Sequence, residues 1–447
     1  MVRRVWWLAV LFLILPRAVW AQGLPFGLSL PPTLNFATSP APIGSGARAA
    51  GKAFAFIAVA DDATAASWNP GALVQIERPE AAIMGAYFLR FERQDVTQPD
   101  TVLDGQTLDS ITLHYLSVAY PLVLFQRNVV LSFSFQRLFD LHGATDIASR
   151  FTTVDGIQRV SSRQRGGLFT LSPAAAMQIT PTFSVGAALN IWPDLFDNGW
   201  EQEVTVRGEG RVVSGNRVVP FVSSGQINEK FRFEGVNVTA GFLWTINSLL
   251  TVGGVFRSPF TAKVRHTHAS SLTVALQDGS PPVTSALQFR DTLDMDMPMS
   301  YGLGVAARLS DDLTVSLDVT RVHWSDFSLE ESAQDDALLV DNGAPSGKGR
   351  AVLQGQGQDT VSVRLGAEYL WNVRHMTVPL RTGFFYDPEP GEHGTDDFFG
   401  FALGSGLTLG KFLFDVAYVF RTGISKSTAT DTTVLQHSLL ASMIYHF

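Results

Sequence analysis

The feature that most constrains the fold of this chain is an alternation of apolar and polar residues that recurs along most of its length. In residues 361–369 the odd positions are apolar and the even positions are polar or glycine, and residues 313–320 repeat the pattern. Successive side chains of a β-strand point to opposite faces, so a period of two predicts strands with one apolar and one polar face. The chain is therefore predicted to be all-β.

Extending this pattern gives fourteen predicted strands, an even number, whose connections alternate between long and short. Outer-membrane barrels have short periplasmic turns and longer extracellular loops. We therefore predict a transmembrane antiparallel β-barrel over residues 81–447, with both termini periplasmic. Further alternation inside the long connections, at 203–206 and 218–219, predicts strands that project beyond the membrane. The fourteen strands are expected near 81–91, 110–120, 128–139, 167–179, 182–191, 229–246, 250–258, 290–308, 312–324, 358–370, 375–386, 397–407, 411–420 and 435–447.

The hydropathy of the chain supports a membrane barrel over a soluble β protein. Hydrophobic residues make up 46% of the sequence and the mean hydropathy is +0.14, yet no segment after residue 21 offers about 18 uninterrupted apolar residues. A membrane-spanning strand needs only about 9–11 residues, of which alternate ones are apolar. The last strand carries an apolar row on one face that ends in an aromatic residue: Leu439, Ala441, Met443, Tyr445 and Phe447.

Both ends of the chain indicate export to the outer membrane. Residues 1–21 combine Arg3 and Arg4 with an apolar run too short to cross a bilayer, which is typical of a cleaved signal peptide. Removing Arg3, Arg4 and Arg17 takes the net charge from -8 to -11, which argues against a nucleic-acid partner. The absence of cysteine excludes disulfides, thiol nucleophiles and lipoprotein acylation.

The segment before the first strand, residues 22–80, differs from the rest of the chain. It begins with several prolines, continues with many small residues and does not alternate. A barrel of fourteen strands encloses a lumen that would otherwise be an open aqueous channel. We therefore predict that residues 22–80 form a hatch that plugs the lumen.

Motifs in this segment carry a family resemblance. Gly-Ala-Arg-Ala at 46–49, Ala-Asp-Asp-Ala at 60–63 and Asn-Pro-Gly-Ala at 69–72 follow one another, and Arg-Ser-Pro at 257–259 is a weaker match further on. In this order the motifs resemble the FadL/TodX family of outer-membrane transporters. The resemblance implies a passive channel for hydrophobic compounds, above all long-chain fatty acids, with an internal apolar pocket, a movable hatch and sideways exit through the wall.

The resemblance also implies that the protein is not an enzyme and needs no cofactor, and no catalytic motif is present in the sequence. An aromatic hydrocarbon channel and a structural or secretion-associated barrel are the alternative functions. The expected partners are the hydrophobic ligand, the lipid and lipopolysaccharide around the barrel, and the barrel assembly machinery, which is expected to recognise the strand ending at Phe447. The protein is expected to be a monomer.

Six residues are candidates for ligand binding, and each has a structural alternative. Phe54 and Phe56 line the pocket or pack the hatch, and Asn69-Pro70 can equally be a turn that launches the first strand. The alternation places Arg364 and Arg381 on the inward face. They are expected either to bind a carboxylate ligand or to pair with Glu368 and Asp387.

In the family the gap in the wall comes from an inward kink of the third strand. The corresponding segment here, residues 128–139, gives the lateral-gate candidates Phe133, Phe135 and Gln136. It contains no glycine or proline that would indicate a kink.

Several motifs remain outside this interpretation, and no metal site is assigned. His266 and His268 share a face but lack a third ligand, so they are expected to be solvated. Whether they, or the acidic group in the loop at 325–357, bind a cation is left open. Met295, Met297 and Met299 are expected to form a lipid-facing row, and Asp61 and Asp62 to cap a short helix over residues 63–67. The acidic group consists of Glu330, Glu331, Asp335 and Asp336.

Overall fold

The computed structural model describes residues 45–447, apart from short gaps in loops and at strand ends. The gaps are 97–100, 104, 151–154, 215–216, 332–339, 342–343, 346–350, 355–356, 374–375, 392–393 and 427–429. The predicted signal peptide and residues 22–44 of the predicted hatch lie outside the described residues, as do Asp335 and Asp336.

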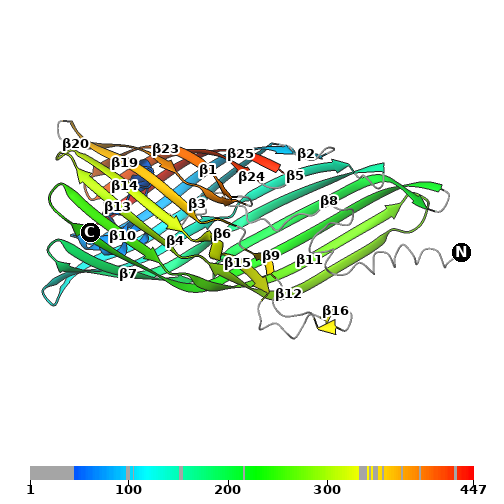
Figure 1. The fold of residues 1–447 in the computed structure, drawn as a ribbon, viewed down its shortest axis with the longest axis horizontal. Helices are drawn as coiled ribbons and strands as arrows, with labels where there is room; N and C mark the ends of the chain where they lie inside the picture. Colours follow the sequence, from blue (N-terminus) through cyan, green and yellow to red (C-terminus); the bar gives the residue numbers. More distant parts are fainter. Residues whose placement is uncertain are drawn as a thin grey trace.

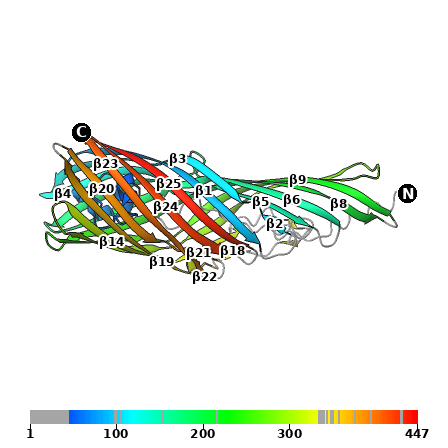
Figure 2. The same cartoon turned by 90° about the horizontal axis from the view of Figure 1, so that it is seen from above.

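Fourteen antiparallel strands form a closed barrel (Figures 1 and 2), as predicted. Each pairs with the next along the chain, and β1 closes the ring by pairing with β25 from Glu80↔His446 to Val96↔Thr430. The barrel strands are β1 (Glu80–Val96), β3 (Gln106–Leu124), β4 (Arg127–Asp140), β6 (Asp155–Thr180), β7 (Phe183–Trp192), β9 (Arg217–Thr245), β10 (Leu250–Arg257), β13 (Ser300–Arg308), β14 (Leu313–Val322), β19 (Thr360–Val373), β20 (Met376–Tyr386), β23 (Phe398–Leu409), β24 (Phe412–Lys426) and β25 (Thr430–His446).

The predicted faces of the strands are confirmed. Leu365 and Leu439 on the apolar rows are 46% and 55% exposed, whereas Arg364 and Ser442 on the opposite faces are buried. Exposed apolar rows belong on the lipid side of a barrel wall and polar rows on the lumen side. Among the described residues, no helix is long and apolar enough to cross a membrane.

Several strands continue past the barrel on one side and form an outer extension, seen at the right of Figure 1. It consists of β5 (Gly143–Arg150), β8 (Gly199–Ser214), β11 (Phe260–Leu276) and β12 (Val283–Met297). The first three pair with the outer parts of β6 and β9, and β12 pairs with β11. The prediction that strands project from the long loops is confirmed. The short turns and Phe447 lie at the opposite end of the barrel, which is therefore the periplasmic end.

One predicted strand and its methionine row are wrong. Residues 290–308 are not a single strand, because Pro298 and Met299 separate β12 of the extension from β13 of the barrel. Met295 and Met297 are 2% and 8% exposed and pack in an inner cluster with Trp192 and Phe233, not against lipid. Pro298 has no backbone N–H to donate, so the strand ends there. The apolar–polar alternation of the sequence nevertheless continues across this break, although β12 and β13 pair with different strands.

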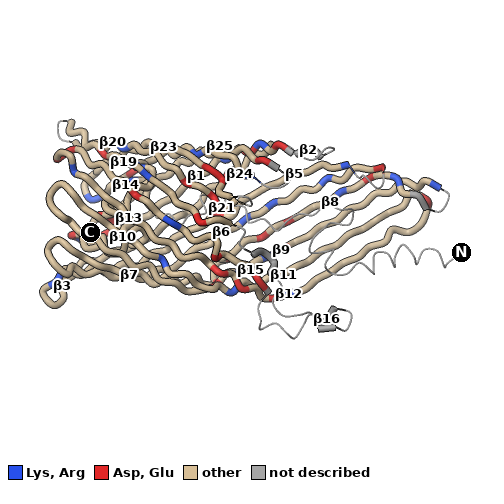
Figure 3. Tube along the Cα trace, viewed as in Figure 1, with Lys and Arg blue, Asp and Glu red and all other residues tan. Residues whose placement is uncertain are grey.

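The smaller elements lie in loops and inside the barrel. They are α2 (Ala47–Gly51), α3 (Ala65–Trp68), η2 (Pro70–Gln75), η3 (Trp324–Asp326), β2 (Thr101–Leu103), β15 (Ser328–Glu331), β16 (Val340–Asp341), β17 (Ala344–Pro345), β18 (Ala351–Gln354), β21 (Glu389–Gly391) and β22 (Gly394–Asp396). Figure 3 shows acidic residues gathered where the barrel meets the outer extension, around β21, β15 and β12.

Residues 45–79, here called the lumenal segment, lie inside the barrel. Their alanines and Phe56 are fully buried and share one core with inward-facing residues of β1, β3, β23 and β24. The wall approaches them closely at glycines: a Cβ on Gly253 would lie 2.6 Å from the carbonyl oxygen of Ile57, and one on Gly71 would lie 2.7 Å from that of Gly241. Strand glycines thus make room for this segment against the wall.

Candidate functional site

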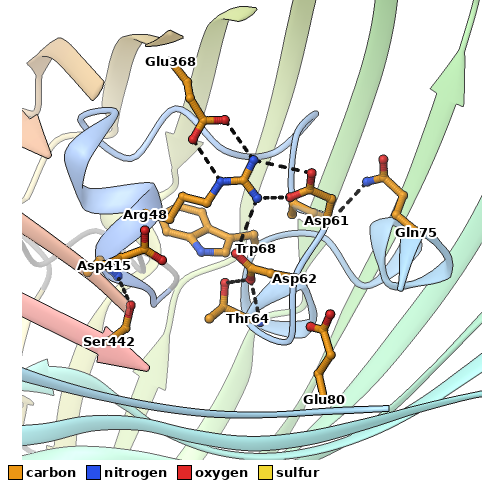
Figure 4. A network of polar contacts seen from close by, with 12 residues as sticks. Arg48, Asp61, Asp62, Thr64, Trp68, Gln75, Glu80, Glu368, Asp415 and Ser442 are labelled. Carbon is orange, nitrogen blue, oxygen red and sulfur yellow. Dashed lines mark hydrogen bonds and ion pairs between the residues drawn. The ribbon is translucent and has the colours of Figure 1, made fainter. Parts of the chain in front are cut away.

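A chain of charged residues joins the lumenal segment to the barrel wall (Figure 4). Arg48 donates to both carboxylate oxygens of Glu368 on β19, at 3.1 and 3.0 Å, and also pairs with Asp61. Glu368 in turn accepts from Arg381 on β20 at 2.6 Å, and Arg381 reaches Asp415 on β24 at 2.5 Å. Charges this deeply buried are stable only when they are paired, so this network fixes the position of the segment.

Two further wall contacts hold the backbone of the lumenal segment. The Asp318 carboxylate on β14 accepts from the backbone N–H groups of Phe56 and Ile57, at 2.6 and 2.8 Å. The Asn69 side chain donates to the carbonyl oxygens of Ile57 and of Phe242 on β9, at 3.0 and 2.8 Å. Both side chains are essentially unexposed.

The predicted roles of Asn69 and the two aspartates are modified by the structure. Asn69 accepts a hydrogen bond from Gly71 N–H and caps η2, and Pro70 lies in the first turn of this helix. The two residues therefore begin a 3-10 helix and do not lead directly into β1. Asp62 accepts from the backbone N–H of Thr64 at 2.8 Å, just before α3, whereas Asp61 pairs with Arg48.

The two phenylalanines of the lumenal segment occupy different surroundings. Phe56 is fully buried, packs edge-on against Trp68 at 5.8 Å and lies 4.4 Å from the Lys52 ammonium. Phe54 stacks on the same Trp68 at 6.2 Å but also lines a cavity. Of the two, Phe54 is therefore the one that can contact a ligand.

One cavity, here called the Phe385 cavity, lies beside the lumenal segment. Its lining combines apolar side chains with Arg364, Arg421 and His114, and includes Phe54, Met84, Phe88, Leu138, Phe385 and Leu440. Arg364 donates to Asp387 at 2.8 Å, and Arg421 to Glu389 at 2.6 Å. Of the two predicted arginines, Arg364 lies at a cavity, whereas Arg381 belongs to the buried charge chain.

A second cavity, here called the Trp192 cavity, lies on the other side of Leu138, which lines both. Its wall includes Phe139, Trp192, Phe260, Met297 and Trp324, together with Ser67 of the lumenal segment and Arg257. Arg257 donates to the Ser67 carbonyl oxygen at 2.9 Å. Within the described part of the chain, no carboxylate lies within 4.0 Å of its guanidinium.

Aromatic rings lead from the outer extension down to the Trp192 cavity. Phe289 and His268 stack at 4.6 Å, then His266 and Phe231 at 4.5 Å, and Phe231 and Trp200 at 4.4 Å. Two residues further along β9, Phe233 contacts Trp192 at 5.3 Å. We call this series the aromatic ladder; its inner end is the wall of the cavity.

The pairing between β3 and β4 ends partway along the two strands. Their pairing runs from Leu124↔Arg127 to Tyr115↔Gln136, and beyond it β3 pairs with β1 and β4 with β6. Both strands carry an irregularity at this level, because the β1 register skips His114 and the β6 register skips Leu138. Two facing bulges therefore end the ladder at one point.

The bulge at Leu138 also explains where the lateral-gate candidates lie. Phe133 is 54% exposed on the lipid side, Phe135 is partly buried against Phe169, and Gln136 faces the Trp192 cavity. One extra residue shifts the alternation, so Phe139 faces the lumen although Phe133 does not. The predicted segment thus contains an irregularity without any glycine or proline.

The pattern did not identify several residues that shape the site. Leu138, His114 and Asp318 became significant only through partners distant in sequence, and Arg257 was noted only as part of the motif at 257–259. The strand glycines were a second signal, since glycine inside an alternating strand indicates a close approach.

The prediction that His266 and His268 are solvated is wrong. Both rings are largely buried, and both bond the Glu229 carboxylate on β9 at 2.7 Å. Their shared partner Glu229 comes from another strand, so the spacing of the two histidines in the sequence gives no sign of it.

Comparisons with known proteins agree with this architecture. The structure is similar to that of a Pseudomonas aeruginosa FadL homologue, with 13% identity and a TM-score of 0.59. The match includes 90% of this chain and 98% of the homologue. It covers 99% of the Ralstonia pickettii toluene transporter TbuX with 91% of its own length, at 15% identity and a TM-score of 0.52. At these identities the similarity shows the fold alone.

No curated protein matches the sequence. Residues 44–398 match the family described as outer membrane protein transport protein (OMPP1/FadL/TodX). The match covers well over half of the chain and includes the segment that carries the motifs. The protein therefore belongs to the FadL/TodX family of outer-membrane transporters for hydrophobic compounds.

Proposed function

We propose that this barrel is a passive channel for long-chain fatty acids, with Arg257 as the anchor for the carboxylate. Arg257 is the observation that carries the proposal, because it combines an apolar cavity wall with a cation that no described carboxylate neutralises. A charge-assisted hydrogen bond to a carboxylate contributes about 1.5–3 kcal/mol. A hydrocarbon without a charged group gains nothing from it.

The apolar part of the ligand supports the same route. Each CH₂ group transferred from water gains about 0.8 kcal/mol. The aromatic ladder places ring contacts between the outer extension and the wall of the Trp192 cavity. We propose that a fatty acid enters along it.

Exit is proposed to be sideways, between β3 and β4. The pairing of these strands ends at Tyr115 and Gln136, and Leu138 beside it lines both cavities. Phe133 and Phe135 lie on the same strand toward the lipid. Sideways release spares the hydrocarbon chain from crossing water.

The lumenal segment is proposed to act as a movable hatch. Ser67 contacts Arg257, so a carboxylate that binds Arg257 competes for a group that now holds the hatch. A ligand shifts a conformational equilibrium only through such a difference in contacts. We propose that this competition loosens residues 45–79 and opens the way between the cavities.

Transport of aromatic hydrocarbons is the second candidate function. The aromatic ladder suits flat rings, and TbuX is described as a toluene transporter. A structural or secretion-associated barrel is a third possibility. For each of these functions we propose that the protein is a monomer embedded in lipid. The barrel assembly machinery is proposed to recognise the strand that ends at Phe447.

The test compares uptake of labelled oleate and labelled toluene in cells that lack the gene and carry variants. We expect Arg257→Gln to lower oleate uptake at limiting concentration by at least about tenfold, from the loss of one charge-assisted bond, and to leave toluene uptake unchanged. Arg308→Gln, an exposed arginine at the periplasmic end, is the matched control. All variants must reach the outer membrane in equal amounts.

The outcomes separate the candidates. Protein-dependent uptake of toluene but not oleate would favour the hydrocarbon channel and refute the role of Arg257. Uptake of neither compound, together with a partner that co-purifies in equal amount, would favour a structural barrel.

A further inference from the structure

Three strands of the outer extension bring two histidines and two carboxylates together. The Glu229 carboxylate on β9 lies 2.7 Å from a ring nitrogen of His266 through Oε2 and 2.7 Å from a ring nitrogen of His268 through Oε1. The ring nitrogens involved are His266 Nε2 and His268 Nδ1. Three possible ligand atoms, one from each residue, lie within 4.8 Å of one another.

The remaining nitrogen of each ring has its own partner. His266 Nδ1 lies 2.8 Å from Asp291 Oδ1 on β12, and His268 Nε2 lies 2.9 Å from Ser270 Oγ. Metal-binding histidines nearly always present the second nitrogen to a carboxylate, carbonyl or similar group, which fixes the tautomer and the direction of the free lone pair. Here both rings are oriented so that one nitrogen of each points at the same carboxylate.

Aromatic walls hold the rings in place. His266 stacks on Phe231 at 4.5 Å and 8°, and His268 on Phe289 at 4.6 Å and 17°. The side chains of His266, His268 and Glu229 are only 12%, 15% and 19% exposed. The cluster lies on the same face of β11 as the buried Ala262 and Val264.

We propose that Glu229, His266 and His268 form a Zn²⁺ site at the outer end of the aromatic ladder. Two imidazoles and one carboxylate are a common donor set for zinc, which completes a tetrahedron with water. Ligand atoms about 2.0–2.1 Å from the metal lie roughly 3.3 Å apart, so the observed 2.7 Å contacts need to open by only a few tenths of an ångström.

Bound zinc would cross-link β9 and β11, and Asp291 would extend the connection to β12. The proposal does not depend on the transported compound. It assigns a further role to the two histidines at the outer end of the aromatic ladder.

The test uses the full-length protein, purified in detergent without a polyhistidine tag and stripped with chelator. We expect wild type to bind one Zn²⁺ per chain by calorimetry and by metal analysis after dialysis. Co²⁺ in its place is expected to give the visible absorption bands of a four-coordinate site. X-ray absorption of the zinc form should show two imidazole ligands.

The variants separate coordination from simple folding. His266→Ala and His268→Ala are each expected to weaken binding by more than about 100-fold, and Asp291→Asn by about 10–100-fold, as for other outer partners of metal ligands. Thr267→Ala, between the two histidines but on the opposite face of β11, is the matched control and should bind as wild type does. Circular dichroism must show an intact barrel in every variant.

Two results would overturn the proposal. One is wild-type protein that takes up no stoichiometric zinc at 100-fold molar excess. The other is equal zinc binding by the His266→Ala and Thr267→Ala variants. Either result would reduce the cluster to a hydrogen-bonded brace between strands.

Discussion

The contact between Asp318 and the lumenal segment allows a direct test of how this segment is held inside the barrel. Asp318 is 1% exposed, and one carboxylate oxygen accepts from both Phe56 N–H and Ile57 N–H. Asp318→Asn keeps the shape and an oxygen acceptor but removes the charge. We expect this change to loosen residues 55–58 while the barrel remains intact.

The size of the effect follows from the two bonds. A hydrogen bond to a charged group contributes about 1.5–3 kcal/mol and one between neutral groups about 0.5–1.5 kcal/mol. Each of the two bonds to residue 318 is therefore weakened by roughly 1 kcal/mol in Asp318→Asn. Two bonds give about 2 kcal/mol, which corresponds to about a 30-fold increase in the local opening equilibrium. Because Asp318 is buried, solvent screening reduces this value little.

Hydrogen exchange measured by mass spectrometry on peptides from residues 52–60 provides the assay. Asp318→Asn should accelerate exchange at Phe56 and Ile57 by about 30-fold. Ser316→Ala removes one neutral bond, from the Ser316 hydroxyl to the Ala55 carbonyl oxygen, and should accelerate it by about fivefold. Leu317→Ala, on the lipid face of the same strand, is the matched control and should leave exchange unchanged.

Two outcomes would refute this reasoning. If Asp318→Asn exchanged as slowly as Leu317→Ala, the carboxylate would not hold the backbone. If peptides around residues 69–75 accelerated equally, the change would have loosened the whole lumenal segment and not one contact. Heat-dependent gel mobility should show a folded barrel in all three variants.

Three further predictions concern packing, charge and pH. Gly71→Ala places a Cβ 2.7 Å from the Gly241 carbonyl oxygen, so the lumenal segment should become sensitive to proteases from the periplasmic side. Arg381→Met leaves the buried Asp415 without its described ion-pair partner and leaves Glu368 paired with Arg48 alone, so it should lower the free energy of unfolding by about 3–5 kcal/mol in denaturant titrations. Burial opposes the charge of Asp359, but hydrogen bonds from Arg321 and Ser325 outweigh it and lower its pKa to about 2. This contribution is present above the usual aspartate pKa near 4 and is lost as pH falls toward 2, so exchange at Ser325 should accelerate only over that interval.

The strands and their faces were predictable from the sequence because each depends on local alternation. The rows ending at Tyr369 and at Phe447 lie outside, and Ser362 and Arg364 lie inside, as their positions required. Period two is enforced by the geometry of a single strand, so it needs no knowledge of the neighbours. The order of strands then followed from short turns and a closed ring.

The alternation gave wrong predictions where the face of a residue depends on how its strand pairs with a neighbour. Met295 and Met297 alternate like a lipid-facing row, but β12 lies in the outer extension and turns them into its packed interior. Phe139 changes face because the β4 register skips Leu138. The register depends on two paired strands, so the residue pattern of one strand cannot reveal it.

The sequence by itself determined a membrane barrel, the lipid and lumen faces of its strands, and, through the motifs at 46–72, the family. Only the tertiary structure decided which side chains meet: Arg257, with no carboxylate partner among the described residues, beside a largely apolar cavity; two bulges that face each other across β3 and β4; and Glu229 between His266 and His268. The physical reason is that alternation is a local property of the backbone. A binding site is made by side chains whose positions in the sequence are up to hundreds of residues apart.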